Sequence, residues 1–178
     1  MKSAIVGLSR ASRDVATSRV LAGLPRVDYQ TFLKSAPDAY AALLALGKVV
    51  GDSGLDKHLT ELVKIRVSQI TGCAFCIQHH LNVARKAGVE SAKLDLVAAW
   101  QDAGVFSERE SAALAWAESL TAVATQGASD KSYEALREHF TETEVIFLTV
   151  AIGTINNWNR IGVALRFSPQ LPHRPART

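Results

Sequence analysis

The segment 73–80, with the sequence CAFCIQHH, holds two cysteines three positions apart and a histidine four positions after the second. At the start of a helix, with about 100° of rotation per residue, His80 projects between Cys73 and Cys76, one turn further on. His79 then points away from Cys73. A helix N-terminus offers unpaired N–H groups and the positive end of the helix dipole, and both favour a thiolate. The pair could therefore cycle between dithiol and disulfide through a sulfenic acid.

A position at a helix N-terminus can greatly increase the fraction of a thiol that is ionised at neutral pH. A thiol with a pKa of about 8.5 is roughly 3% ionised at pH 7, and one whose pKa is lowered to about 6 is roughly 90% ionised. The increase in thiolate is partly offset because a less basic thiolate is a weaker nucleophile. The plain alternative is a pair of buried cysteines on a core helix.

Other uses of two cysteines fit the spacing less well. A zinc site would combine Cys73, Cys76 and His80 with a fourth ligand such as Glu61 or His79, and this spacing is not that of a standard closed zinc site. Attachment of a c-type haem requires histidine directly after the second cysteine, where isoleucine stands. A thioredoxin-like site requires a βαβ context, which the sequence does not predict.

Glu61 lies twelve positions before Cys73, on a preceding helix that is mostly apolar. A carboxylate that reaches His80 would hold the imidazole in one tautomer and raise its basicity, which would complete a Cys–His–Glu relay. The alternative is an exposed Glu61 paired with Lys64. Arg66 falls near the middle of the apolar arc of the same helix, and we expect it to be an ion-paired core residue.

The elements that must position these side chains are all predicted to be helices, because apolar residues recur at helical spacing and no stretch alternates with a period of two. Capping boxes at Ser107/Glu110 and Thr141/Glu144 mark two helix starts. The expected helices cover residues 37–51, 59–70, 74–87, 91–100, a segment after Ser107, a short segment capped by Asp130, and 141 to about 166.

Length and composition limit the domain organisation and the class of protein. The chain has 178 residues, 48% of them apolar, which predicts one domain at 27–167 with an N-terminal arm at 1–26 and a Pro/Arg-containing tail at 168–178. Two cysteines are too few for a disulfide scaffold. The net charge of +3 is scattered, and no apolar run is long enough to span a bilayer, so we expect neither a nucleic-acid nor a membrane partner. The expected location is the cytoplasm.

Two of the expected helices, 59–70 and the first half of 141–166, are apolar over more than one face. A helix that is apolar nearly all round is buried centrally or between subunits. One small domain has limited room for two such helices, so we expect a homo-oligomer.

Taken together, these residues resemble the alkylhydroperoxidase D-like core of the carboxymuconolactone decarboxylase family. The resemblance covers roughly residues 27–167 and rests on the joint pattern E-x₁₁-C-x₂-C-x₃-H, on the segments ELVKIR (61–66) and ARKAG (84–88), and on INNWNR (155–160). It implies an all-α alkylhydroperoxidase D-like bundle of six to eight helices, without a cofactor or a metal. It also implies a trimer or hexamer.

The resemblance further implies a thiol-dependent peroxidase that acts on hydroperoxides. Cys76 would be the peroxidatic cysteine and Cys73 the resolving one, with Glu61 and His80 as the proton relay. The reductant would be a lipoyl or thioredoxin-type dithiol. The chain departs from the founding peroxidase type at Phe75, where that type has a histidine; His79 could replace it, although its helical direction favours exposure.

Two alternatives stay open at this point. A carboxymuconolactone-type decarboxylase is the first, and the cysteine pair argues against it because such members generally lack that pair. A non-enzymatic dithiol redox sensor is the second. The polar segment 156–160 and its Trp158 are interpreted as structural or interfacial rather than catalytic.

Overall fold

The structure, a computed structural model, describes residues 25–171, and within that range it is helical with no strand. This confirms the predicted all-α class. In chain order the helices are α2 (Tyr29–Ser35), α3 (Pro37–Gly51), α4 (Lys57–Thr71), α5 (Ala74–Ala87), α6 (Ser91–Leu96), the 3₁₀ helix η1 (Val97–Ala99), α7 (Trp100–Ala103), α8 (Glu108–Thr121), α9 (Val123–Gln126), α10 (Asp130–Arg137) and α11 (Glu142–Leu165).

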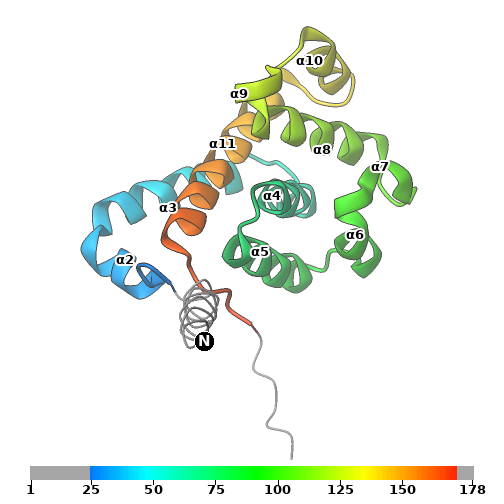
Figure 1. Cartoon of the computed structure of the whole chain (residues 1–178). Coiled ribbons are helices and arrows are strands. Elements are labelled where there is room, and N and C mark those ends of the chain that lie inside the picture. The colour runs from blue at the N-terminus through cyan, green and yellow to red at the C-terminus, as the bar shows by residue number, and fades with distance from the viewer. Residues whose placement is uncertain (1–24, 172–178) are drawn as a thin grey trace, which may run out of the picture.

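Helix α4 is the centre of the fold. Figure 1 shows it end-on, surrounded by α5, α8, η1 and α11, all of which contact it. Its apolar side chains serve two core clusters, because Leu62 and Ile65 face α6 and η1 whereas Val63 and Val67 face α8 and α11. A helix with two buried faces must be apolar nearly all round. Of the two placements expected for 59–70, central or between subunits, the structure shows the central one.

The link between α4 and α5 fixes the cysteine pair. Asp56 caps the start of α4, and Gly72 ends it in the left-handed conformation at φ 70°, which glycine adopts without strain. Cys73 follows at once as the N-cap of α5. The two helices run antiparallel, since His58 at the start of α4 contacts the carbonyl of Ala87 at the end of α5.

Some expected elements differ in detail. The single helix expected at 91–100 breaks into α6, η1 and α7, where Trp100 reaches across to donate a hydrogen bond to Glu118. Ser129, not Asp130, caps α10. Both predicted capping boxes are present, at the starts of α8 and α11. The break at 96–97 depends on tertiary contacts, which a local pattern does not encode.

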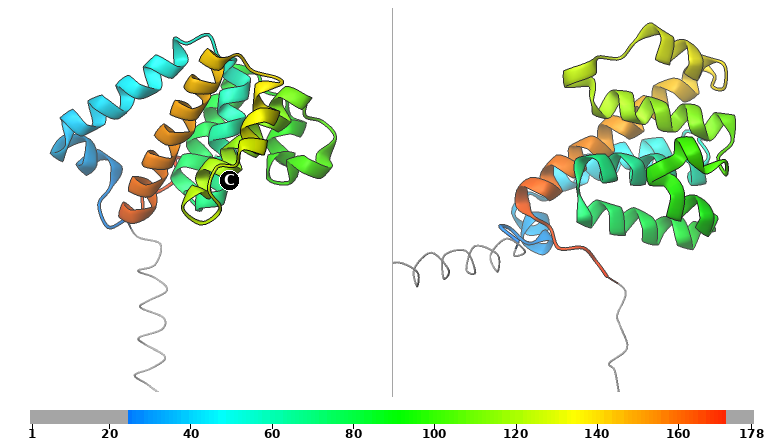
Figure 2. Two further views of the ribbon diagram at one scale, coloured as in Figure 1. Left: turned by 90° about the horizontal axis from the view of Figure 1, so that it is seen from above. Right: turned by 45° about the vertical axis from the view of Figure 1, so that its right-hand side comes forward.

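Helix α3 packs along α11 at the edge of the molecule, together with α2 (Figure 2). Leu44, Leu46 and Val49 of α3 remain exposed. The backbone before α2 is tied to the end of α11, because the N–H groups of Arg26 and Val27 both donate to the carbonyl of Leu165. These contacts hold α2 and α3 in place beside α11.

The predicted arm 1–26 lies almost entirely outside the described residues, as does most of the tail 168–178. Within 25–171, no helix has both the length and the apolar content needed to cross a membrane.

Arg66 pairs with Glu118 at 2.7 Å between Nε and Oε1, and both side chains are largely buried, as expected for an ion-paired core residue.

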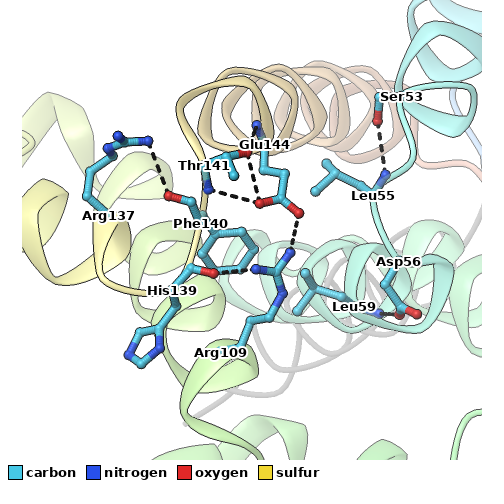
Figure 3. A network of polar contacts seen from close by, with 10 residues as sticks. All are labelled: Ser53, Leu55, Asp56, Leu59, Arg109, Arg137, His139, Phe140, Thr141 and Glu144. Carbon is cyan, nitrogen blue, oxygen red and sulfur yellow. Dashed lines mark hydrogen bonds and ion pairs between the residues drawn. The ribbon is translucent and has the colours of Figure 1, made fainter.

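The junction of α8, α10 and α11 is held by one arginine (Figure 3). Arg109 donates to the carbonyl of His139 and to Glu144, where Nη2 and Oε1 are 2.6 Å apart. Its guanidinium also lies 3.9 Å from the ring centre of Phe140, a cation–π contact. Glu144 completes the capping box of α11 by accepting from the N–H of Thr141. The backbone N–H of Thr141, then Arg109 and then the Thr141 hydroxyl lower the pKa of Glu144 below its usual value.

Replacing Glu144 with alanine should lower the free energy of unfolding by roughly 1.5 kcal/mol, because α11 loses a cap and Arg109 loses its partner. Urea denaturation at pH 7 measures this. Glu142→Ala is the matched control, since Glu142 lies exposed in the same helical turn and should cost at most about 0.5 kcal/mol. Equal losses in the two variants would show that the Arg109 junction contributes nothing specific.

Candidate active site

Cys73 and Cys76 are joined by a disulfide, with their Cα atoms 5.3 Å apart. Both side chains are buried, at 2% and 3% exposure. Cys73 is the N-cap residue of α5, directly before the helix that the sequence predicts at 74–87. Its Sγ accepts a hydrogen bond from the backbone N–H of Cys76 at 3.3 Å. In the reduced protein, this N–H and the helix dipole favour negative charge on the Cys73 sulfur.

Helix α11 closes over the cysteine pair at a glycine. A Cβ at position 162 would lie 3.0 Å from Sγ of Cys73 and 3.5 Å from Sγ of Cys76. Phe167, just after α11, is buried next to the same point and packs on Phe75. The missing side chain of Gly162 is therefore what lets α11 approach the disulfide.

Gly162→Ala should shift the dithiol–disulfide equilibrium toward the dithiol by about tenfold, roughly 30 mV. The added methyl group crowds the Cys73 sulfur where the disulfide holds it, whereas a free thiol can rotate away. Equilibration with a lipoic acid redox buffer measures the shift. Gly153→Ala is the control, because a Cβ at this exposed position of α11 meets nothing within 4 Å and should leave the equilibrium unchanged.

Glu61 and His80 are in direct contact, with Oε2 2.8 Å from Nδ1. Glu61 is 1% exposed. Burial by itself raises the pKa of this carboxyl, but the hydrogen bond with His80, the charge of Lys64 and that of His80 outweigh it and lower the pKa to about 2. An ionised carboxylate can only accept, so Nδ1 of His80 is the donor, and Nε2 is the ring nitrogen that can accept a proton when the imidazole is uncharged.

His80 follows Cys76 by four residues on α5, so the two side chains lie on one face, a turn apart. Glu61 comes from α4, and its Oε2 accepts from Nδ1 of the imidazole. On its other oxygen Glu61 accepts from Lys64, with 2.9 Å between Oε1 and Nζ. The structure thus brings together all four residues that the sequence singles out, from two antiparallel helices.

A pocket of about 420 Å³ opens beside these residues. Cys76 lines it, as do Glu61 and His80, whereas Cys73 is not among its lining residues. Most of the wall is apolar or aromatic and comes from α3 and α11 in addition to α4 and α5. A small molecule in this pocket would therefore meet Cys76 and not Cys73.

Aromatic rings form one end of the pocket. Phe75 packs against Tyr29 of α2, with ring centres 4.9 Å apart, and stacks on His79. Burial first, and then the hydrogen bond and charge of Tyr40, raise the pKa of Tyr29 to about 12, so it remains a neutral phenol. His79 is exposed, as its helical direction predicts, yet it also lines the pocket. Partial burial and the neighbouring His80 lower the pKa of His79.

Tyr29, Tyr40, Lys48 and Lys57 line this pocket but are not among the site residues expected from the sequence. Lys57 and Lys64 flank Glu61 at positions −4 and +3, which is a readable helical signal. Tyr29 and Tyr40 have no such signal, because they reach the site only through the packing of α2 and α3. Within 25–171, no group of three or more side chains is placed to hold a metal ion.

The polar residues of the last helix are held by internal hydrogen bonds. Asn159 is fully buried against Ser68 of α4, at 3.1 Å. Asn156 donates to Thr121 of α8, and Arg160 folds back onto Asn156. Trp158, by contrast, lines the pocket.

Fold and site together define an all-helical protein with a buried CxxC disulfide beside a Glu–His pair and a pocket. A family model, the carboxymuconolactone decarboxylase family, matches residues 37–119. The chain is 35% identical over 135 residues to the uncharacterised protein YdfG of Bacillus subtilis, an alignment covering 76% of this chain and 92% of YdfG. The chain belongs to the carboxymuconolactone decarboxylase family.

Solved structures show the same architecture. The Agrobacterium tumefaciens protein ATU0492, whose function is unknown and which is described as a candidate AhpD antioxidant defence protein, superposes with a TM-score of 0.79 at 38% identity. That superposition covers 84% of this chain and all of the other. The alkyl hydroperoxide reductase AhpD of Streptomyces coelicolor is 48% identical, over 42 residues that make up 24% of each chain. These matches place the chain in the AhpD-like part of the family.

Proposed function

We propose that the protein is a thiol-dependent peroxidase that reduces hydroperoxides by cycling Cys73 and Cys76 between dithiol and disulfide. The observation that carries the proposal is the asymmetry of the pair. Cys76 lines the pocket and lies one helical turn from His80, which is held by Glu61, whereas Cys73 does not line the pocket and is the nearer of the two sulfurs to Gly162. The AhpD relatives support the same role.

The oxidising half of the cycle starts at Cys76. Nε2 of His80 takes the thiol proton, and the resulting imidazolium is stabilised by the Glu61 carboxylate. The Cys76 thiolate attacks the terminal oxygen of the hydroperoxide, so an S–O bond forms and the O–O bond breaks. The leaving alkoxide takes the proton held by His80 and departs as the alcohol, and Cys76 becomes a sulfenic acid. Cys73 then attacks the Cys76 sulfur, a disulfide forms, and water is released.

The reducing half requires two electrons from an external dithiol, either lipoyl or thioredoxin-like. The pocket directs this dithiol to Cys76 as well, so the mixed disulfide forms there and Cys73 is the leaving thiolate. The N–H of Cys76 that points at Sγ of Cys73 stabilises that leaving group. The helix N-cap and the pocket thus support opposite roles for the two sulfurs.

The test is turnover of cumene hydroperoxide by the full chain with dihydrolipoamide as reductant. A peroxidase consumes many equivalents of hydroperoxide per protein and forms the alcohol in equal amount. Consumption that stops after one equivalent would identify a dithiol sensor instead and would refute the proposed enzymatic role.

We also propose that the protein is a cytoplasmic homo-oligomer, a trimer or a hexamer. The exposed apolar residues of α3, Leu44, Leu46 and Val49, support association. Light scattering coupled to size exclusion, with Val49→Lys as the disrupting variant, tests this: a wild-type chain that elutes as a monomer would rule it out.

A further inference from the structure

The pocket is much larger than a hydrogen peroxide molecule requires. At about 420 Å³ it falls in the range of sites for small organic ligands. One wall carries Leu43, Leu44 and Val50 of α3, and the facing wall carries Ile155 and Trp158 of α11. Such walls favour a hydroperoxide with an apolar body, because burying that body against them releases water from both surfaces.

Positively charged side chains outnumber negatively charged ones among the residues that line the pocket. Three lysines line it, Lys48, Lys57 and Lys64, against one carboxylate, Glu61. Lys48 is neutralised by Asp52 and Lys64 by Glu61. Lys57 lies 3.9 Å from Oε1 of Glu61, beyond hydrogen-bond distance, and both oxygens of Glu61 already accept from other donors. The ammonium group of Lys57, 63% exposed, therefore keeps donors for an incoming anion.

Lys57 also lies at a useful distance from the reactive cysteine. It is the first residue of α4, one turn before Glu61, and α4 runs antiparallel to α5. The contact between Glu61 and His80 puts Cys76 and Lys57 on opposite sides of that pair, each one turn away. Eight residues at 1.5 Å correspond to about 12 Å along the helix axes. A substrate that spans both groups must carry its charge at the end opposite its hydroperoxide.

We propose that the pocket selects hydroperoxides that carry a carboxylate at the far end of an apolar body, with Lys57 binding the carboxylate while the O–O bond meets Cys76. The inference rests on the proposed peroxidase function. It adds a substrate class and a specificity-determining residue. Lys57 has only a long ion pair with Glu61, so the field of its ammonium group favours an anionic ligand over a neutral one of the same shape.

The decisive comparison uses one molecular framework with three charges: cumene hydroperoxide, its para-carboxylate and its para-aminomethyl derivative. At low ionic strength kcat/KM should be about fivefold higher for the carboxylate than for the neutral compound, and lowest for the ammonium compound. Salt at 0.5 M should reduce the differences. The ortho-carboxylate should gain little, because its charge lies beside the hydroperoxide.

Lys57→Gln should bring the ratio of carboxylate to neutral kcat/KM to within about twofold of one, because the anion loses its partner. Lys131→Gln is the control. Lys131 is an exposed lysine at the start of α10, outside the pocket, and its removal should leave both the ratio and the rate unchanged. A ratio near one in the wild type, or a ratio untouched by Lys57→Gln, would overturn the inference while leaving the peroxidase proposal standing.

A binding measurement separates this inference from catalysis. Calorimetry with 4-isopropylbenzoate, which carries no hydroperoxide, should give several-fold tighter binding than 4-isopropylbenzyl alcohol in the wild type and equal binding in Lys57→Gln. If no hydroperoxide is turned over but benzoate binding depends on Lys57, the proposed function fails and the anion site stands. Equal binding of acid and alcohol by the wild type would refute the anion site.

Discussion

Cys76→Ser should lower steady-state consumption of cumene hydroperoxide by roughly a thousandfold or more, the loss expected when an enzyme loses its nucleophile. Cys76 is the cysteine that lines the pocket, and it lies one turn from the His80 base. A serine hydroxyl is neither ionised at neutral pH nor able to accept oxygen from a peroxide. The measurement is hydroperoxide loss with dihydrolipoamide.

Cys73→Ser is the informative counterpart. It should also fail to turn over, but one equivalent of hydroperoxide should still convert Cys76 to a sulfenic acid, which dimedone traps and mass spectrometry detects. In the reduced wild type, Cys76 should react with iodoacetamide faster than Cys73, because Cys76 lines the pocket and Cys73 does not. Trapping of sulfenic acid on Cys73 in Cys76→Ser would reverse the proposed roles.

Glu61→Gln should raise the apparent pKa for alkylation of Cys76 by about one unit and lower peroxidase turnover by roughly 10- to 100-fold. The amide can still accept from Nδ1 of His80, but it cannot stabilise the imidazolium by charge. His80→Ala should shift the alkylation profile in the same direction. Unchanged profiles in both variants would eliminate the relay.

A second buried carboxylate provides a control that separates loss of the relay from loss of stability in Glu61→Gln. Glu118 is another largely buried carboxylate with a cationic partner, Arg66, but it lies outside the pocket. Glu118→Gln should lower the free energy of unfolding by about 1–3 kcal/mol without moving the alkylation profile. A shift of the profile in Glu118→Gln would mean that loss of stability, and not loss of the relay, explains the effect of Glu61→Gln.

The pH dependence of stability follows from the pKa of Glu61, which folding lowers from 4.5 to about 2. A lowered carboxyl pKa stabilises the fold at pH values above the unfolded value, and that stabilisation is lost as the pH falls toward the folded value. Glu61→Gln should therefore cost about 3 kcal/mol at pH 7 and progressively less between pH 4.5 and pH 2. Urea denaturation at several pH values checks this.

Much of the fold could be predicted because its signals are local. The capping boxes at Ser107 and Thr141, and apolar residues at helical spacing, identify the helices without any tertiary information. The segment 91–103 shows the limit. Its break into three short helices depends on Trp100 reaching Glu118, eighteen residues further on, and no local pattern contains that contact.

The sequence by itself determined which side chains could do chemistry. Cys73, Cys76 and His80 share one helix start, and Glu61 lies at a fixed spacing before them, so their mutual geometry follows largely from helical periodicity and one tight turn. Tertiary structure decided what the two cysteines face. Gly162 lies against both sulfurs, nearer to that of Cys73, and Tyr29, Tyr40 and Trp158 line the pocket that Cys76 also lines. These residues come from α2, α3 and α11, and only packing between distant helices, driven by burial of apolar surface, brings them to the site.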